Sequence, residues 1–369
     1  MFVLAKKCFV ESVDLISGSA FGMGCLVVAG LRWLKFLKAA RTSLPMPLVI
    51  LKSVQDARSA IEPFIKVTPV VRSQFLSDFC EGDVFLKLEN QQVTGSFKPR
   101  GVFNKLLHLS SEERARGVVT ASAGNHGQAV AYAAKQLGFS ATVVLPTGMP
   151  HVKVEGIRKY GAEVVVYGSF FDEAEERAKE IATESGCVFI SAYNDELIIS
   201  GHGTLGLEIL GDLPKVQTII VPVGGGGLIA GVAGAVKAVR PELRVLGVQS
   251  EASPVMHNSL HAGKVVDLLT PQAETIAEGL FGGLEKDAIT FEIVQELVDD
   301  VMIVREESLK RAVRLLWEKD HQRVEGSGAA GVALLLENKD LFEGETVVAV
   351  VTGGNIDEAL FRSIINRKG

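Results

Sequence analysis

The chain has 369 residues, of which 47% are apolar and 22% are charged, and these ordinary proportions argue against a disordered chain or a coiled coil. Its formal net charge is −6, which argues against a protein that binds nucleic acid through the phosphate backbone. The four cysteines (Cys8, Cys25, Cys80 and Cys187) form neither a disulfide framework nor a metal-ligand spacing, so we expect a reducing compartment, the cytoplasm, and no bound metal.

Residues 1–45 differ from the rest of the chain in charge. They carry a net charge of +4, which leaves −10 for the remaining sequence. The stretch 15–31 is uncharged over 17 residues, the lower limit for a membrane-spanning helix, but its glycines and serines make it only modestly apolar. We expect residues 1–45 to be an extension upstream of a working protein that begins near Met46. A targeting segment or a membrane anchor is the alternative, and we do not expect a membrane protein.

From residue 46 onward, strand and helix patterns alternate along the chain. Strands are expected over 84–88, 118–120, 141–145, 163–167, 187–190, 218–222, 244–249 and 346–351. Helices are expected over 53–64, 101–109, 126–137, 152–160, 172–183 and 228–239. This alternation with short glycine-rich connections is typical of parallel sheets covered by helices. Because ligands of such sheets bind beyond the carboxyl ends of the strands, chemistry is expected in the loops that follow strands.

The first such loop, 94–101, places Lys98 between Phe97 and Pro99, just ahead of an expected helix. A lysine in a partly desolvated cleft has a lowered pKa and can form a Schiff base with an aldehyde. A surface lysine beside a turn is the structural alternative.

The second loop, 120–127, lies between a strand and a helix and contains Ser122, Gly124, Asn125 and His126. Its backbone N–H groups would face an anion at the helix N-terminus, and Ser122 and Asn125 add polar side chains. Ordinary helix capping by serine or asparagine is the alternative.

The third loop contains four consecutive glycines between a buried strand and a helix: Gly224, Gly225, Gly226 and Gly227. Such a run is costly in chain entropy, and it allows the backbone to approach a phosphate closely. A flexible hinge is the alternative.

The fourth loop places Thr352 at a strand end before two glycines. Its hydroxyl suits a neutral hydrogen bond to a ring nitrogen, although a single threonine in such a turn can also be purely structural. Together the four loops offer an amine for an aldehyde, donors for a carboxylate, a cradle for a phosphate and a hydroxyl for a ring nitrogen. Pyridoxal 5'-phosphate needs this set of partners.

With these motifs, in consistent order over about residues 50–365, the chain resembles the fold type II pyridoxal-phosphate enzymes. Within them it resembles the threonine and serine dehydratases (ammonia-lyases), which are related to serine racemase. The resemblance implies an α/β fold like the tryptophan synthase β subunit: two open parallel-sheet domains with the cofactor in the cleft between them. The large cofactor-binding domain would comprise 46–115 and 197–369, and the small domain 116–196. A homo-oligomer, either a dimer or a tetramer, is implied as well.

The resemblance also implies roles for individual residues. Lys98 would carry the cofactor and act as the catalytic base. Further cofactor contacts would come from Phe97 beside the ring, Asn125 at the ring hydroxyl, Gly224, Gly225, Gly226 and Gly227 at the phosphate, and Thr352 at the ring nitrogen. The substrate carboxylate would lie among Ser122, Gly124, Asn125 and His126. The stretch 275–279 matches the acidic loop of the family, which faces the cofactor from the large domain.

The activity implied is β-elimination of L-threonine or L-serine to 2-oxobutanoate or pyruvate plus ammonia, of the catabolic type without a regulatory domain. Three departures from the family pattern bear on this. Ala123 stands where racemases have a second serine, so racemisation is expected to be weak. Gln249 stands where metal-stimulated members have a glutamate, which argues against Mg²⁺ at that place. His202 replaces the usual glutamine and has no assigned role. A 3-hydroxyaspartate ammonia-lyase, a serine racemase-like enzyme and a non-catalytic cofactor-binding protein remain as alternatives.

Overall fold

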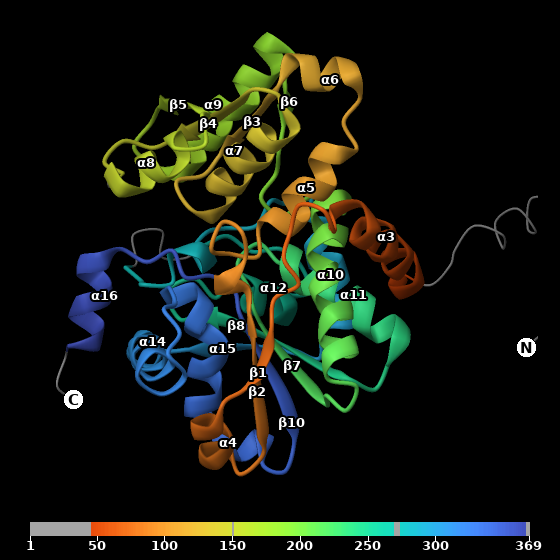
Figure 1. The fold of residues 1–369 in the computed structure, drawn as a ribbon, viewed down its shortest axis with the longest axis vertical. Helices are drawn as coiled ribbons and strands as arrows, with labels where there is room; N and C mark the ends of the chain where they lie inside the picture. Colours follow the sequence, from red (N-terminus) through yellow and green to blue (C-terminus); the bar gives the residue numbers. More distant parts are fainter. Residues whose placement is uncertain (1–45, 150, 269–273, 367–369) are drawn as a thin grey trace, which may run out of the picture. The chain divides into compact units, whose positions relative to one another are not determined.

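The computed structural model describes residues 46–149, 151–268 and 274–366 (Figure 1). The expectations for residues 1–45, including the uncharged stretch 15–31, lie outside the described residues. Within the described ranges, no helix is both long and apolar enough to cross a lipid bilayer.

The larger sheet has six strands in the order β1-β2-β10-β7-β8-β9. Neighbouring strands pair in parallel, except for β1, which is antiparallel to β2. The strands are β1 (Val70–Arg72), β2 (Asp83–Leu88), β7 (Thr218–Pro222), β8 (Arg244–Ser250), β9 (Asp300–Val304) and β10 (Thr346–Val351). Strands β2, β7, β8 and β10 lie within one residue of their expected ranges, whereas β9 was not expected.

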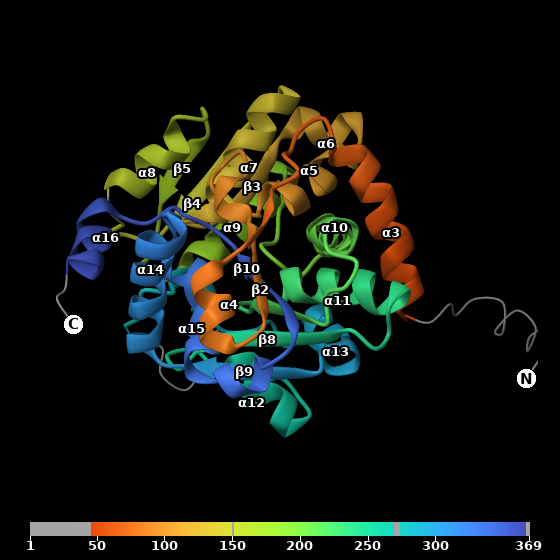
Figure 2. The same ribbon diagram turned by 60° about the horizontal axis from the view of Figure 1, so that its bottom comes forward.

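Helices cover both faces of the larger sheet (Figure 2). They are α3 (Met46–Ile61), α4 (Gln74–Cys80), α5 (Pro99–Leu107), α10 (Glu196–Asp212), α11 (Gly227–Val239), α12 (Val255–Ala262), α13 (Ile289–Leu297), α14 (Glu306–Asp320), α15 (Gly326–Glu337) and α16 (Glu358–Ile365). Short 3-10 turns lie at Glu89–Gln91 (η1), Glu278–Leu280 (η2) and Lys339–Phe342 (η3).

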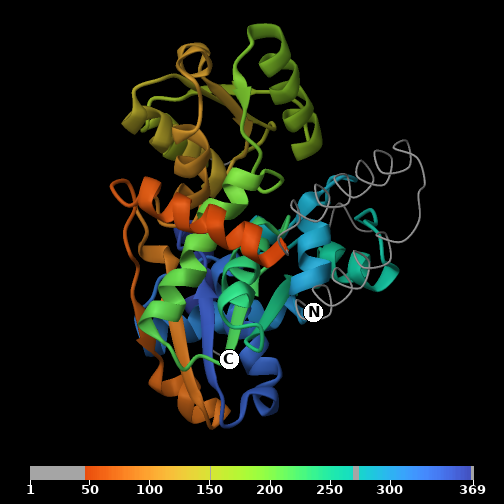
Figure 3. The same cartoon turned by 90° about the vertical axis from the view of Figure 1, so that its right-hand side faces the viewer.

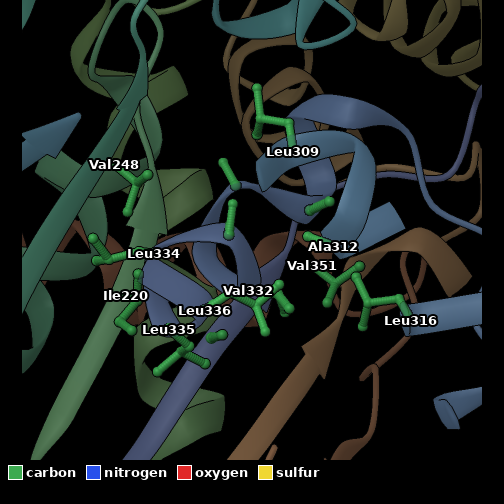
Figure 4. Packing of buried hydrophobic residues seen from close by; sticks show 14 of the residues in the cluster. Ile220, Val248, Leu309, Ala312, Leu316, Val332, Leu334, Leu335, Leu336 and Val351 are labelled. Atoms are coloured by element: carbon green, nitrogen blue, oxygen red, sulfur yellow. The ribbon is translucent and has the colours of Figure 1, made fainter. Parts of the chain in front are cut away.

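Successive residues of β10 point to opposite faces and enter two different cores. Val347 and Val351 join the cluster that includes α14 and α15, which Figure 4 shows around Val332, Leu335 and Leu316. Val348 and Val350 join the cluster that includes α10 and α11. A strand buried on both faces has a continuous run of β-branched residues in its sequence. This pattern is why the predicted range of β10 agrees with the structure at both ends.

The smaller sheet is wholly parallel, with strand order β5-β4-β3-β6. Its strands are β3 (Val118–Ala121), β4 (Ala141–Leu145), β5 (Glu163–Val166) and β6 (Val188–Phe189). Its helices are α6 (Ser111–Arg116), α7 (Asn125–Leu137), α8 (His151–Arg158) and α9 (Phe171–Ser185). Figure 3 shows this part from the side, above the larger sheet. Helix α5 contacts both α7 and α10 and so joins the two parts.

Candidate active site

Three of the four predicted loops meet through direct contacts at the carboxyl ends of β10 and β3. The backbone N–H of Phe97 donates to the carbonyl of Thr352 at 3.1 Å, and Ser96 forms an isolated bridge with Gly353. The side chain of Asn355 donates to Asn125 Oδ1 at 2.7 Å. The structure therefore brings together segments that lie more than 200 residues apart in the sequence.

Lys98 stands immediately before α5, with Pro99 in the first turn of that helix. Its Nζ donates to the carbonyl of Ala192 at 2.9 Å and lies 5.1 Å from the centre of the Phe97 ring. Burial lowers the pKa of Lys98 to about 8, although the nearby Glu325 carboxylate opposes this shift. A lysine with this pKa has a substantial neutral fraction near neutral pH and can act as a nucleophile or a base.

Asn125 begins α7, and both ends of its side-chain amide are engaged. Its Nδ2 donates to Glu325 Oε1 at 2.7 Å, and its Oδ1 accepts from Asn355. Burial raises the pKa of Glu325 to about 7, while the hydrogen bond from Asn125 partly offsets the shift. The sequence does not indicate Glu325 as a site residue, because no pattern links it to Asn125, 200 residues away.

Three further predicted residues line the start of α7. Ser122 Oγ accepts from the N–H of Gly124 at 3.2 Å, and a side chain at Gly124 would meet no atom within 4 Å. His126 is buried, with Nε2 at 3.2 Å from the carbonyl of Ile190, and its Nδ1 has no partner among the described residues. Burial and then the charge of Lys98 lower the pKa of His126 to about 3, so its ring is neutral.

The four glycines connect β7 to α11, and two of them, Gly225 and Gly227, pack against Tyr193. A Cβ added to Gly225 would lie 2.3 Å from Tyr193 Cγ, and one added to Gly227 would lie 3.0 Å from the Tyr193 backbone. Gly226 has φ +87°, which side chains rarely adopt. Among the described residues, no acceptor pairs with the amide N–H groups of residues 224–227. These free donors, in front of a helix N-terminus, fit a phosphate group.

The remaining predicted residues lie in the same region. Thr352 is buried directly after β10. The partly buried Phe97 ring meets His202 edge-on at 4.7 Å, and burial holds the pKa of His202 well below its usual value. His202 therefore supports Phe97 as a neutral aromatic group. Tyr193 and Ala192, which follow β6, were not predicted and contact the glycines and Lys98 respectively.

Gln249 stands at the position where metal-stimulated members of the family have a glutamate, and its side chain is engaged in hydrogen bonds within the protein. Its Nε2 donates to the carbonyl of Val223 at 3.3 Å, and its Oε1 accepts from the N–H of His257 at 2.9 Å. In the part of the chain that the structure describes, no group of three or more His, Cys, Asp or Glu residues could hold a metal ion.

Comparisons with known proteins agree on one family. The family model described as "Pyridoxal-phosphate dependent enzyme" matches residues 61–353. The L-threonine ammonia-lyase of Thermotoga maritima is 43% identical over 320 residues, which cover 87% of this chain and 79% of that protein. The catabolic L-threonine dehydratase of Staphylococcus aureus is 42% identical over 314 residues, 84% of this chain and 90% of that protein. The solved structure of maize serine racemase matches with a TM-score of 0.81 and 38% identity, covering 85% of this chain and 96% of that one.

Proposed function

Because the chain belongs to the family of pyridoxal-phosphate dependent enzymes, we propose that it eliminates water from L-threonine or L-serine. The released enamine then reacts with water and gives 2-oxobutanoate or pyruvate plus ammonia. It is a carbon–nitrogen lyase that acts on a small amino acid. The observation that carries the proposal is the convergence of Lys98, Asn125 and the Thr352 loop at the carboxyl ends of β3 and β10. The names of the Thermotoga and Staphylococcus relatives support the substrate.

The residues present fit the cofactor, which supplies an electron sink for the α-carbon when bound. Lys98 would hold its aldehyde, and the free N–H groups of residues 224–227 would hold its phosphate. Asn125 would face the ring oxygen, Thr352 the ring nitrogen and Phe97 the flank of the ring. The hydroxyl of Thr352 can make only a neutral hydrogen bond there, unlike a carboxylate.

The side chains then divide the work of elimination between binding and proton transfer. Ser122, Gly124, Asn125 and His126 would bind the substrate carboxylate at the N-terminus of α7, where backbone N–H groups and the helix dipole favour an anion. Lys98 would remove the α-proton as a neutral amine, with the carbonyl of Ala192 orienting its Nζ. Because the ring of His126 is neutral, it does not repel the positive charge that Lys98 gains when it takes up the proton.

The charged groups near the site favour a substrate with one carboxylate. Lys153 of α8 is a cation near the site with which a second carboxylate could pair, and it is already paired with Glu278 of η2. Both groups act electrostatically on Glu325, which places them near the site. A dicarboxylate such as 3-hydroxyaspartate would therefore have to break this pair, so we propose the monocarboxylate substrates.

We also propose the domain division: 46–115 and 197–369 as the large domain, 116–196 as the small domain, and 1–45 as an extension. The separate six-stranded and four-stranded sheets support the division. A cytoplasmic homo-oligomer, a dimer or a tetramer, without nucleic-acid or membrane partners and without a bound metal, completes the proposal. The internal hydrogen bonds of Gln249 support the absence of a metal at that position.

The test is to incubate the purified holoenzyme with L-threonine, L-serine and 3-hydroxyaspartate and to measure 2-oxo acid and ammonia. We expect product from threonine and serine and little from 3-hydroxyaspartate. Product from 3-hydroxyaspartate alone would replace the proposed substrate. Interconversion of serine enantiomers at the elimination rate would favour a racemase, and no reaction with any substrate would favour a binding protein.

Gly225→Ala should weaken cofactor binding by about tenfold to a hundredfold, because the new Cβ overlaps the Tyr193 ring and displaces the phosphate loop. Gly211→Ala is the matched control, since a Cβ at Gly211 meets no atom within 4 Å. Titration of cofactor-free protein with pyridoxal phosphate, followed by fluorescence, measures both. Equal dissociation constants for the two variants would contradict the role of the glycines.

The rate at which cofactor-free protein attaches the aldehyde should rise with pH, reach half of its maximum near pH 8 and level off above it, because only the neutral amine reacts. At pH 7 about one molecule in ten would carry a neutral Lys98, against about three in ten thousand for an ordinary lysine. Stopped-flow absorbance between about pH 6 and 10.5 measures the profile, with the reaction of Nα-acetyl-lysine as the control. A rate that still rises tenfold per pH unit above pH 9 would show that the pKa of Lys98 is not lowered.

A further inference from the structure

A continuous chain of hydrogen bonds runs past the site through three side chains, and we call it the amide chain: the carbonyl of Thr94, Asn355, Asn125 and Glu325. Asn355 Nδ2 donates to the carbonyl of Thr94 at 2.8 Å and to Asn125 Oδ1 at 2.7 Å. Asn125 Nδ2 then donates to Glu325 Oε1 at 2.7 Å. The chain therefore begins on a backbone carbonyl and ends on a carboxylate, and both of these ends are acceptors.

The two acceptor ends determine how the amides between them are oriented. Because the Thr94 carbonyl can only accept, Asn355 must direct its NH₂ group toward it, and that group also reaches Asn125. Asn125 must then direct its oxygen toward Asn355 and its nitrogen toward Glu325. If the Asn125 amide were flipped, its NH₂ group would face the NH₂ group of Asn355, and its oxygen would face the carboxylate of Glu325. Neither of these two contacts is a hydrogen bond.

This orientation leaves Asn125 with a single unused N–H donor. Its Oδ1 accepts from Asn355, and one of its two N–H bonds is donated to Glu325. The second N–H bond is the only donor that remains, while Oδ1 keeps one lone pair on the side of Asn355, so a ligand on the nitrogen side of Asn125 meets a donor. A donor at this place favours a negatively charged oxygen over a hydroxyl group.

Two glycines leave room for the amide chain. A Cβ on Gly95, which has φ +75°, would lie 2.7 Å from Asn355 Oδ1. A Cβ on Gly353 would lie 3.2 Å from Asn125 Nδ2 and would overlap Glu325 Oε1. Both glycines belong to the loops that carry Lys98 and Thr352, so the amide chain is built from the same loops as the proposed cofactor site.

We propose that Asn355 and Glu325 are positioning residues that hold Asn125 with an N–H donor facing the ring oxygen of the cofactor. They act through Asn125 and keep that oxygen ionised. The inference rests on the cofactor contact assigned to Asn125 in the proposed function, and it adds the two residues that give the contact its direction.

The experiment compares Asn355→Leu and Asn355→Asp with the wild type. Either change removes the donor to Asn125 Oδ1, so that Asn125 can turn and lose its fixed N–H donor. We expect the cofactor dissociation constant to rise about tenfold or more, the effect of one hydrogen bond to a charged group. We also expect the visible absorbance band of the bound cofactor, which belongs to the ionised ring oxygen, to lose intensity to the near-ultraviolet band.

Asn366→Asp is the control for the added charge, because Asn366 lies at the end of α16 and outside the amide chain. A shift of the absorbance bands in Asn355→Asp but not in Asn355→Leu would assign the effect to charge and overturn the proposal. Unchanged bands and affinity in both variants would overturn it as well. A lower unfolding temperature with unchanged bands would indicate a structural role only, which is likewise against the proposal.

Glu325→Gln distinguishes the negative charge of Glu325 from its role as a hydrogen-bond acceptor for Asn125. Glutamine keeps an amide oxygen for Asn125 Nδ2, so we expect the absorbance bands to stay near those of the wild type, whereas Glu325→Leu should shift them. These measurements need no turnover. If the wild type released no 2-oxo acid while the Asn355 variants shifted the bands as expected, the proposed reaction would fail and the positioning role would stand.

Discussion

Lys98→Ala should lower kcat for 2-oxo acid formation by about a thousandfold or more, because it removes both the amine that holds the cofactor and the base that takes the α-proton. The structure supplies the physical reason for this size. Lys98 is the amine held by the carbonyl of Ala192 beside Phe97, with its pKa lowered to about 8. Absorbance of the 2-oxo acid under saturating L-threonine measures the loss.

Lys98→Arg should not rescue the activity, because a guanidinium stays protonated and cannot serve as nucleophile or base. Lys135→Ala is the matched control, since this exposed lysine lies on α7 away from the loops of the site. The control should keep the wild-type rate. Retention of more than about a tenth of the activity in Lys98→Ala would contradict its assignment as the catalytic base.

The sequence was most informative where a strand is buried on both faces. Strands β4, β7 and β10 match their expected ranges because continuous runs of β-branched and other apolar residues are typical of strands buried on both faces. The comparisons confirm the fold class and the cofactor that the four loops indicated.

The sequence pattern did not predict helix α10, because several of its residues are glycines that allow close packing but have low helix propensity. It carries glycines where other backbones approach: a Cβ on Gly201 would lie 2.4 Å from the carbonyl of Arg100, and one on Gly203 would lie 2.7 Å from that of Gly231. Helix α15 is similar, since a Cβ on Gly328 would meet the carbonyl of Gly353. Glycine lowers helix propensity, so the local sequence does not indicate these two helices. Their tertiary contacts stabilise them instead.

Part of the candidate site was hidden for a different reason. Glu325 acts through a contact with Asn125, and such long-range pairs follow from the fold and not from local spacing. Tyr193 and Ala192 follow the very short strand β6, which offers little pattern to locate the loop after it. By contrast, the loops that carry Lys98, Asn125 and Thr352 could be found because each one follows a well-marked strand.

A buried ionic network lies directly beneath the Lys98 loop. Arg100, two residues beyond Lys98, pairs with Glu89 at 2.8 Å and with Glu208 at 2.7 Å, and its side chain is fully buried. Lys87 pairs with Glu208 at 2.6 Å from the other side. Burial alone would raise the pKa of Glu89, but the Arg100 guanidinium holds it below its usual value. Removing Arg100 would therefore leave two buried carboxylates with only Lys87 to compensate them.

Arg100→Met should lower the free energy of unfolding by about 3 to 5 kcal/mol, the usual loss when one partner of a buried ion pair is removed. Urea denaturation measures it, with Arg72→Met as the control, because Arg72 and Asp83 form an exposed pair whose loss costs less than about 1 kcal/mol. The difference between Arg100→Met and the wild type should shrink as the pH falls. Protonation relieves the unpaired Glu89 of the variant, whereas in the wild type it would discharge a carboxylate that Arg100 stabilises. A loss as small as that of the control, or one that grows toward acid pH, would mean that Arg100 does not neutralise these carboxylates.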